Sequence, residues 1–331
     1  MEISVLYLSG SKKLATLPEL SSATSLERVD LKGFRIPSDI FSLSSLRLLS
    51  LNNCKRLQHL PELPERTTVL QAFNCTSLET VKSPLPFALV PKCNGRRRQK
   101  GIFNYCNCFN LEHNTLGNIL TNARLRIEDK FGFSEFSDSF LVGLPGTEIP
   151  EWFSYENLGS SIAFVLPPKC INAKYLHLAF CVVLEFKVPL AMEKYNNFVL
   201  TCELHLKNAD GNEVPLIMVA PKIYHDNVHF GAAIESDHVF LWHNRYCVKP
   251  WLKHNCSDVN KLSIESEFKV DNLHKGNARH IDLVELKFLV TLLLGAEEFW
   301  FCVRVLGYLV SGCSLFFTGF GSSLVDPVLV I

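Results

Sequence analysis

The sequence predicts two successive folds: an α/β solenoid of about four short repeats, followed by an all-β sandwich of the jelly-roll or Ig-like type. An apolar pattern recurs along residues 1–83, which predicts the solenoid. Apolar and polar side chains then alternate strictly in stretches of residues 139–308, which predicts the sandwich. Residues 84–138 are expected to form a linker and a helix, and residues 309–331 an apolar tail of unknown role.

The repeats follow the pattern of leucine-rich repeats, which has apolar residues at positions 1, 4 and 6 and Asn or Cys at position 9. The fourth copy is degraded, with Thr67 and Ala72 at apolar positions, and only the last two copies have Cys at position 9. The four copies begin at residues 3, 26, 46 and 67, so their starts lie 23, 20 and 21 residues apart. Cys54 and Cys75 occupy the ninth position of the last two copies. We expect these thiols to bond to backbone inside the coil. A pair of metal ligands is the less favoured alternative.

Polar and aromatic residues stand between the inward-facing apolar positions, where a solenoid of this kind forms its concave face. Such a mixture suits protein recognition. The candidate binding residues are Tyr7, Arg28, Asp30, Lys32, Ser50, Asn52, Gln71 and Phe73. For each residue the alternative is a solvated face without a partner.

The region between the two predicted folds contains one helical pattern and one basic run. Apolar residues recur at near-helical spacing, which predicts a helix over residues 114–130. The basic run covers residues 96–100. A nuclear-localisation or phosphate-binding role is one interpretation of this run. We favour a solvated loop, because the run holds only four charges.

Strands are predicted where the two-residue alternation is clearest. Residues 198–207 form such a stretch, and Asp210-Gly211 follows it as a hairpin signal. Residues 261–270 have the same alternation. Further strand candidates are residues 175–186, 237–243 and 283–291. Several strands with turn signals and few helices indicate a sandwich or jelly roll.

The segment LPGTEIPEWF at residues 144–153 begins the second predicted fold. Its Pro145-Gly146 pair is a turn signal, since Gly adopts the positive φ of a type II turn. Together with SSIAFVLP at residues 160–167, the segment resembles the opening motif of the β-rich domain that follows the leucine-rich repeats in plant TIR-NB-LRR immune receptors. Cys302-Val303-Arg304 is similar to the final strand of that domain.

This resemblance implies an Ig-like or jelly-roll domain after the repeats. It implies a role in plant disease resistance, with a pathogen effector or a guarded host protein as the binding partner. A complete TIR-NB-LRR receptor is a further expected partner. The cytoplasm is the expected location, with the nucleus as an alternative.

Composition excludes some classes of partner. The 331 residues contain 33 basic and 33 acidic side chains, so no net field attracts nucleic acid, and none is expected as a ligand. There are 12 cysteines, and Met1 is not followed by a secretory signal pattern, which favours a reducing compartment with free thiols.

Catalytic and cofactor motifs are missing from the sequence. There is no P-loop, nucleophile elbow or His-Glu-x-x-His motif, so we expect neither catalysis nor a cofactor. His243, Cys247, His254 and Cys256 have spacings that match no usual zinc site, and no metal is expected. The resemblance leaves one alternative open, namely a piece of a full receptor whose TIR domain hydrolyses NAD.

The C-terminal region allows a second alternative, a membrane-anchored sensor. Residues 299–320 carry only Arg304 as a charge, and their number could cross a bilayer. Gly307, Gly312 and Gly319 interrupt this stretch, and no basic flank follows it. A buried strand followed by an apolar tail is therefore the favoured interpretation.

Overall fold

A computed structural model describes most of the chain, and strands dominate what it describes. The described residues are 4–8, 20, 22–34, 36, 38–82, 100–128, 139–148, 150, 161–165, 175–184, 198–207, 211, 213–219, 234, 236–247, 263–274, 277–280, 287–296 and 299–308. Among these residues α1 (His113–Glu128) is the single α-helix, and η1 (Ser38–Ser42) is a short 3-10 helix. The predicted β-rich character is confirmed.

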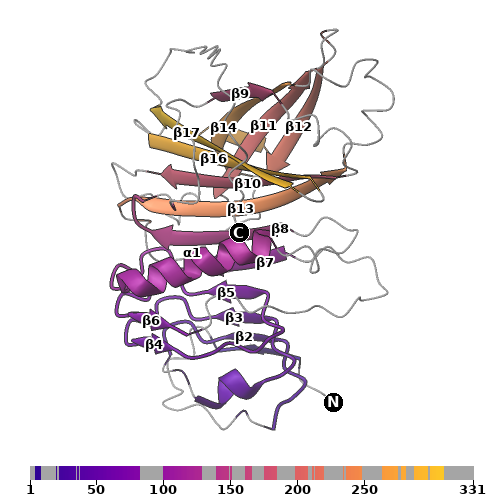
Figure 1. The fold of residues 1–331 in the computed structure, drawn as a ribbon. Coiled ribbons are helices and arrows are strands. Elements are labelled where there is room, and N and C mark those ends of the chain that lie inside the picture. The colour runs from indigo at the N-terminus through magenta and orange to yellow at the C-terminus, as the bar shows by residue number, and fades with distance from the viewer. Residues whose placement is uncertain are drawn as a thin grey trace.

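Five short strands lie side by side in a parallel ladder that begins near the N-terminus (Figure 1). They are β1 (Val5–Tyr7), β2 (Arg28–Asp30), β3 (Leu48–Ser50), β5 (Val69–Gln71) and β7 (Lys100–Asn104). Two further strands, β4 (His59–Leu60) and β6 (Thr80–Val81), pair in parallel as a separate small sheet.

The inward side of the ladder is apolar. Val29, Leu49, Leu70 and Phe103 lie in register across β2, β3, β5 and β7, and all four are fully buried. Alternation along each strand directs these residues to one face and their neighbours to the other. Stacking successive strands therefore builds one continuous apolar layer, which no single short strand could bury alone.

The strand β7 was not predicted from the sequence. Phe103 of β7 pairs with Leu70 of β5, and the Cys108 thiol donates to the carbonyl of Ala72. Phe103 and Cys108 thus occupy the places that Leu70 and Cys75 occupy one strand earlier.

A residue in the left-handed conformation follows each of the strands β2, β3, β5 and β7. These residues are Gly33, Asn53, Asn74 and Asn107, with φ of 75°, 60°, 59° and 61°. Gly adopts this conformation without a steric cost, and Asn tolerates it better than most residues. The repeated choice of Gly or Asn gives the same tight turn after each strand.

The ladder continues without a break into antiparallel strands. The strand β8 (Ser139–Pro145) pairs in parallel with β7 and antiparallel with β13 (His238–Cys247). The sheet then extends through β10 (Tyr175–Leu184), β16 (Lys287–Ala296) and β17 (Phe299–Tyr308). One ten-stranded sheet therefore joins the two halves of the chain (Figure 1).

A second, five-stranded sheet lies beyond the antiparallel end of the first (Figure 1). It contains β9 (Ser161–Val165), β11 (Phe198–Lys207), β12 (Glu213–Val219), β14 (Ser263–His274) and β15 (Asn277–His280). The predicted hairpin is confirmed, since β11 pairs antiparallel with β12 and Gly211 between them has φ of 82°. The strand β16 begins and ends later than the predicted 283–291.

The helix α1 covers the junction between the two halves, and its prediction is confirmed. Ile119, Ala123 and Ile127 are buried in the same apolar cluster as Phe103 and Phe140. The Arg126 guanidinium lies over the rings of Phe103 and Phe140, 5.6 and 5.9 Å from their centres. One helix thus packs on β7 of the ladder and β8 of the antiparallel part, which fixes the two together.

Candidate protein-recognition surface

Four of the eight predicted binding residues fall in one row across the ladder. Tyr7, Asp30, Ser50 and Gln71 are register partners on β1, β2, β3 and β5, and Asn104 of β7 extends the row. Alternation places this row on the face opposite the apolar layer. The structure therefore brings these side chains together, as a concave recognition face requires.

Of the predicted binding residues, only those near the N-terminal end of the ladder are accessible to a partner. Tyr7 is 66% exposed, Arg28 is exposed and Lys32 is partly exposed. The other five predicted binding residues are buried, which limits what they offer a partner in this conformation. They are Asp30, Ser50, Asn52, Gln71 and Phe73.

The buried polar residues of this face bond to other groups of the ladder. The Asn52 side-chain oxygen accepts from the Phe73 N–H at 3.0 Å, and its amide donates to the Ser50 hydroxyl at 3.4 Å. An Asp30 carboxylate oxygen accepts from the Lys32 N–H at 3.1 Å. These bonds satisfy buried backbone and side-chain groups, so the structure gives the residues an architectural role.

Val5 and Tyr7 form an exposed apolar margin on β1. Val5 is 37% exposed, and Val5 and Tyr7 flank a single residue on the same strand. Exposed aromatic side chains beside arginine are typical of protein interfaces. Together with Arg28 and Lys32 they define what we call the ladder-edge surface: Val5, Tyr7, Arg28 and Lys32.

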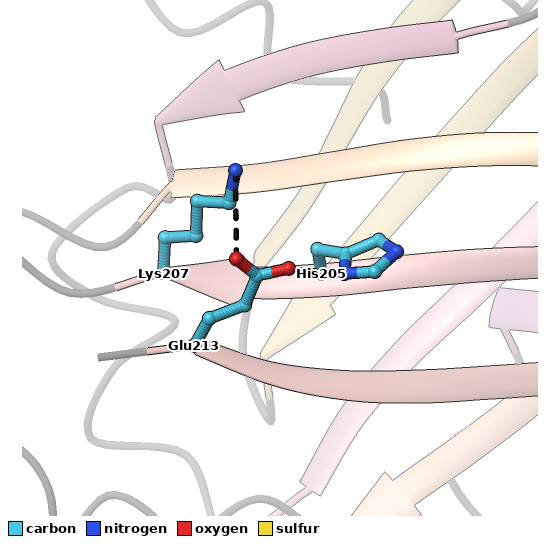
Figure 2. A network of polar contacts seen from close by, with 3 residues as sticks. All are labelled: His205, Lys207 and Glu213. Carbon is cyan, nitrogen blue, oxygen red and sulfur yellow. Dashed lines mark hydrogen bonds and ion pairs between the residues drawn. The ribbon is translucent and has the colours of Figure 1, made fainter. Parts of the chain in front are cut away.

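A second polar cluster lies where β11 turns into β12. Figure 2 shows Glu213 of β12 between His205 and Lys207 of β11. One Glu213 oxygen contacts the Lys207 ammonium at 3.7 Å and the other bonds to Nδ1 of His205. All three side chains are 32–40% exposed. We call His205, Lys207 and Glu213 the hairpin-tip cluster.

The sequence reasoning did not single out this cluster. Its signal was the alternation of residues 198–207, which places His205 and Lys207 on the same side of the strand. The hairpin prediction then brings Glu213 opposite Lys207, as the register has it. A charge pair across a hairpin adds at most about 1 kcal/mol when partly exposed.

The cysteines of the ladder are structural. Cys54, Cys75 and Cys108 donate their thiols to the carbonyls of Leu31, Leu51 and Ala72 at 3.4, 3.1 and 3.0 Å. The expected bonds of Cys54 and Cys75 to backbone are confirmed. Hydrogen bonding with Cys75, together with burial, holds the pKa of Cys54 well above its usual value. Burial likewise raises the pKa of Cys106. The thiols of Cys54 and Cys106 therefore stay protonated, which suppresses their reactivity.

Other predicted features fall partly outside the described residues. His243 is buried and stacks on Phe140, with 6.0 Å between ring centres, while His254 and Cys256 lie outside. In the described ranges no group of three His, Cys, Asp or Glu residues is arranged to hold a metal. Residues 96–99 of the basic run and the tail at 309–331 also lie outside.

The possible membrane span at residues 299–320 lies partly within the described residues. Its first ten residues, Phe299–Tyr308, form the strand β17, which pairs with β16. Within the part of the chain that the structure describes, no helix has the length and apolar character that a bilayer span requires.

Comparison with known proteins identifies the β-rich part and its relatives. Residues 144–306 match the C-JID domain. Disease resistance protein RPS4B of Arabidopsis thaliana is 30% identical over 246 residues, which cover 72% of this chain and 20% of that protein. Disease resistance-like protein CSA1 of the same plant is 29% identical over 69% of this chain and 18% of its own length. No solved structure matches the chain.

A third relative matches a larger share of the chain. Disease resistance protein RPS4 of Arabidopsis thaliana is 27% identical over 291 residues, which cover 84% of this chain and 23% of that protein. The chain spans about a fifth of the length of these curated relatives.

The fold and these matches together place the chain in the class of β-rich plant disease-resistance proteins. More specifically, the chain corresponds to the C-terminal part of a TIR-NB-LRR disease-resistance receptor, and it contains a C-JID domain. The family resemblance found in the sequence is confirmed. The relatives that it matches are disease resistance proteins of a plant.

Proposed function

We propose that the chain is a non-catalytic protein-recognition module of a plant innate-immune receptor. It binds a pathogen effector, or a host protein that the receptor guards, and it needs no cofactor. The C-JID match and the disease-resistance relatives support this role. We place its action in the cytoplasm, with the nucleus as the alternative.

We interpret the parallel ladder as the end of a leucine-rich repeat array. Its strands follow one another in parallel register, and buried cysteines recur at the turn after β3, β5 and β7. We interpret the antiparallel strands of both sheets as a jelly-roll or Ig-like sandwich. These finer assignments rest on the strand order and on the repeat pattern of the sequence.

The observation that carries the proposal is the parallel pairing of β7 with β8, which makes the ladder and the C-JID domain one sheet. A partner can then contact both parts without the cost of first ordering them relative to one another. The ladder-edge surface and the hairpin-tip cluster supply exposed aromatic, cationic and anionic groups for such contacts.

A binding screen of the full chain against a panel of purified effector proteins tests the proposal. For an effector that binds, two variants probe the two surfaces: Tyr7→Ala with Arg28→Glu, and a swap of residues 208–213. The matched control is Leu125→Ser, which changes an apolar residue of α1 that is 49% exposed. We expect each surface variant to weaken binding at least about tenfold, as loss of an interface anchor does. Binding that either surface variant leaves unaltered would contradict the proposal.

The alternative enzymatic role concerns a longer receptor. The relatives are several times longer than this chain, so a full gene product could carry a TIR domain that hydrolyses NAD. Sequencing of transcripts through the region before Met1 distinguishes a recognition module alone from a longer receptor that carries a TIR domain. An in-frame TIR and P-loop upstream would favour the enzyme for the gene product, with this chain as its recognition part.

A further inference from the structure

Backbone N–H groups at the left-handed turns follow a regular bonding rule. The N–H of Gly33 donates to the carbonyl of Asn52, that of Asn53 to Phe73, and that of Asn74 to Cys106, at 3.0, 2.8 and 2.9 Å. Each of these carbonyls belongs to the turn of the following ladder strand. In each case, therefore, the backbone N–H of one turn is bonded to a backbone carbonyl of the next turn along the ladder.

Asn107 is the corresponding residue of the last parallel turn, and its acceptor is different. Its N–H donates to Nε2 of His238 at 2.9 Å, across 131 positions of sequence. Asn107 has φ of 61°, like Asn53 and Asn74, so its N–H emerges from the same kind of turn. A histidine ring nitrogen thus stands where another turn would have placed a carbonyl.

The other ring nitrogen holds His238 in place. Nδ1 lies 3.1 Å from the carbonyl oxygen of Ser236, and because a carbonyl only accepts, Nδ1 carries the proton. Nε2 is then unprotonated and is the acceptor that Asn107 requires. Ser236 is itself left-handed, with φ of 60°, which directs its carbonyl back at the ring that begins β13.

The surroundings of the ring favour the neutral form. His238 is fully buried, and burial lowers its pKa to about 4. The Phe109 ring meets it edge-on at 5.8 Å, and the Phe240 ring lies 6.3 Å away. The neutral imidazole therefore bonds to both sides at neutral pH and packs between rings from the turn and from β13.

We propose that His238 is the C-terminal cap of the parallel ladder: its side chain replaces the missing next turn and ties the ladder to the C-JID domain. A buried helix or strand end without such an acceptor would leave an unsatisfied N–H. The cap makes the last turn and the start of β13 open together. This inference does not depend on which partner the chain binds.

Amide hydrogen exchange in the full chain, followed by NMR, tests the cap. His238→Phe keeps an aromatic ring and removes both hydrogen bonds. We expect the Asn107 amide to exchange about ten- to a hundredfold faster, which is the effect of losing one buried hydrogen bond. Phe240→Leu is the matched control, since it removes a neighbouring ring from the same strand and leaves both bonds in place. The Asn107 amide should keep its protection in this control.

His238→Gln provides the rescue, because the glutamine side-chain oxygen can accept from the Asn107 N–H. We expect it to restore part of the protection that His238→Phe removes. Equal exchange of the Asn107 amide in the wild type and in His238→Phe would overturn the cap.

The unmodified chain offers a second test that does not depend on a variant folding. In a sample labelled with ¹⁵N at histidine, the His238 ring should show a protonated Nδ1 and an unprotonated Nε2 at pH 7. A proton on Nε2 would overturn the proposal, because that nitrogen could not accept from Asn107.

Discussion

The side-chain amide of Asn104 donates a 3.1 Å hydrogen bond to the side-chain oxygen of Gln71, which joins the fourth and fifth strands of the ladder. Both residues are 1% exposed. The Asn104 oxygen also accepts from the Cys106 N–H at 3.0 Å. One side chain thus links β5, β7 and the turn that follows, at the point where the ladder meets the C-JID domain.

Replacing Asn104 should therefore destabilise the junction. Asn104→Leu removes the donor to Gln71 and the acceptor for the Cys106 N–H while keeping a similar volume. We expect the free energy of unfolding to fall by about 1–3 kcal/mol, because buried polar groups lose their partner. Urea unfolding followed by circular dichroism measures this. A loss below about 0.5 kcal/mol, the range of neutral surface changes, would contradict the assigned role.

Gly143 of β8 is required by close packing. A Cβ there would lie 2.9 Å from the Cys106 sulfur and 3.2 Å from Cε1 of Phe240. Gly143→Ala should destabilise the fold by about 1–3 kcal/mol, as overpacking of a filled core does. Gly117→Ala is the matched control, since Gly117 is an exposed position of α1 with no atom near its Cβ.

The control should leave stability unchanged or raise it by up to about 1 kcal/mol, because alanine is the better helix former. The double variant Gly143→Ala with Cys106→Ala should recover part of the loss, since it removes the closest clashing atom. Thermal unfolding of the four proteins checks these expectations. Equal effects of the two glycine substitutions would count against the packing argument.

The buried thiols should resist alkylation. Cys54, Cys75, Cys106 and Cys108 are buried and unpaired with other cysteines. Hydrogen bonding with a neighbouring thiol, together with burial, raises the pKa of Cys54 and of Cys75, so the reactive thiolate form is scarce. Iodoacetamide treatment followed by peptide mass spectrometry should leave these four unmodified in the native chain and modify them in urea. If any of these four cysteines in the native chain reacts as fast as an exposed thiol does, its place in the core is contradicted.

Acid should weaken the fold through His238. Its pKa is lowered to about 4 in the folded chain, against an ordinary value of 6.5. Between these values the unfolded chain binds a proton that the folded chain excludes, so stability is lost as pH falls from about 6.5 to 4. Asp237 immediately precedes β13, and the rings of Phe109 and Phe240 lie next to the imidazole.

From pH 7 to pH 5 this one group should cost the wild type about 2 kcal/mol, since one pKa unit corresponds to about 1.36 kcal/mol. His238→Phe lacks this titration, so its stability should fall less over the same interval. Urea unfolding at both pH values measures the difference. Parallel pH profiles for the two proteins would show that His238 is not the group responsible.

Much of the strand layout follows from the sequence. The spacing of Leu26, Leu46 and Thr67 locates β2, β3 and β5, because each copy buries its apolar positions against the next. The alternation of residues 198–207 predicts β11 for a similar reason. The signal for β7 was Phe103-x-Tyr105-x-x-Cys108, but residues 83–99 separate it from the previous copy and break the period of 20 to 23 residues.

The candidate surface could be predicted only in part. Alternation shows that Asn52 and Gln71 share a face with Arg28, but it cannot show that they are buried and Arg28 is exposed. Burial depends on tertiary packing, which the alternation along a strand does not reveal. The bond between Asn107 and His238 has no local sequence signal, because its partners are 131 positions apart.

Amide hydrogen exchange of the full chain, with and without a bound effector, tests the central claim most directly. That claim is that the ladder and the C-JID domain recognise a partner as one surface. Binding should slow exchange both at Val5–Tyr7 and Arg28–Asp30 and around the hairpin formed by β11 and β12. Protection confined to α1, or to one of the two regions alone, would contradict the account.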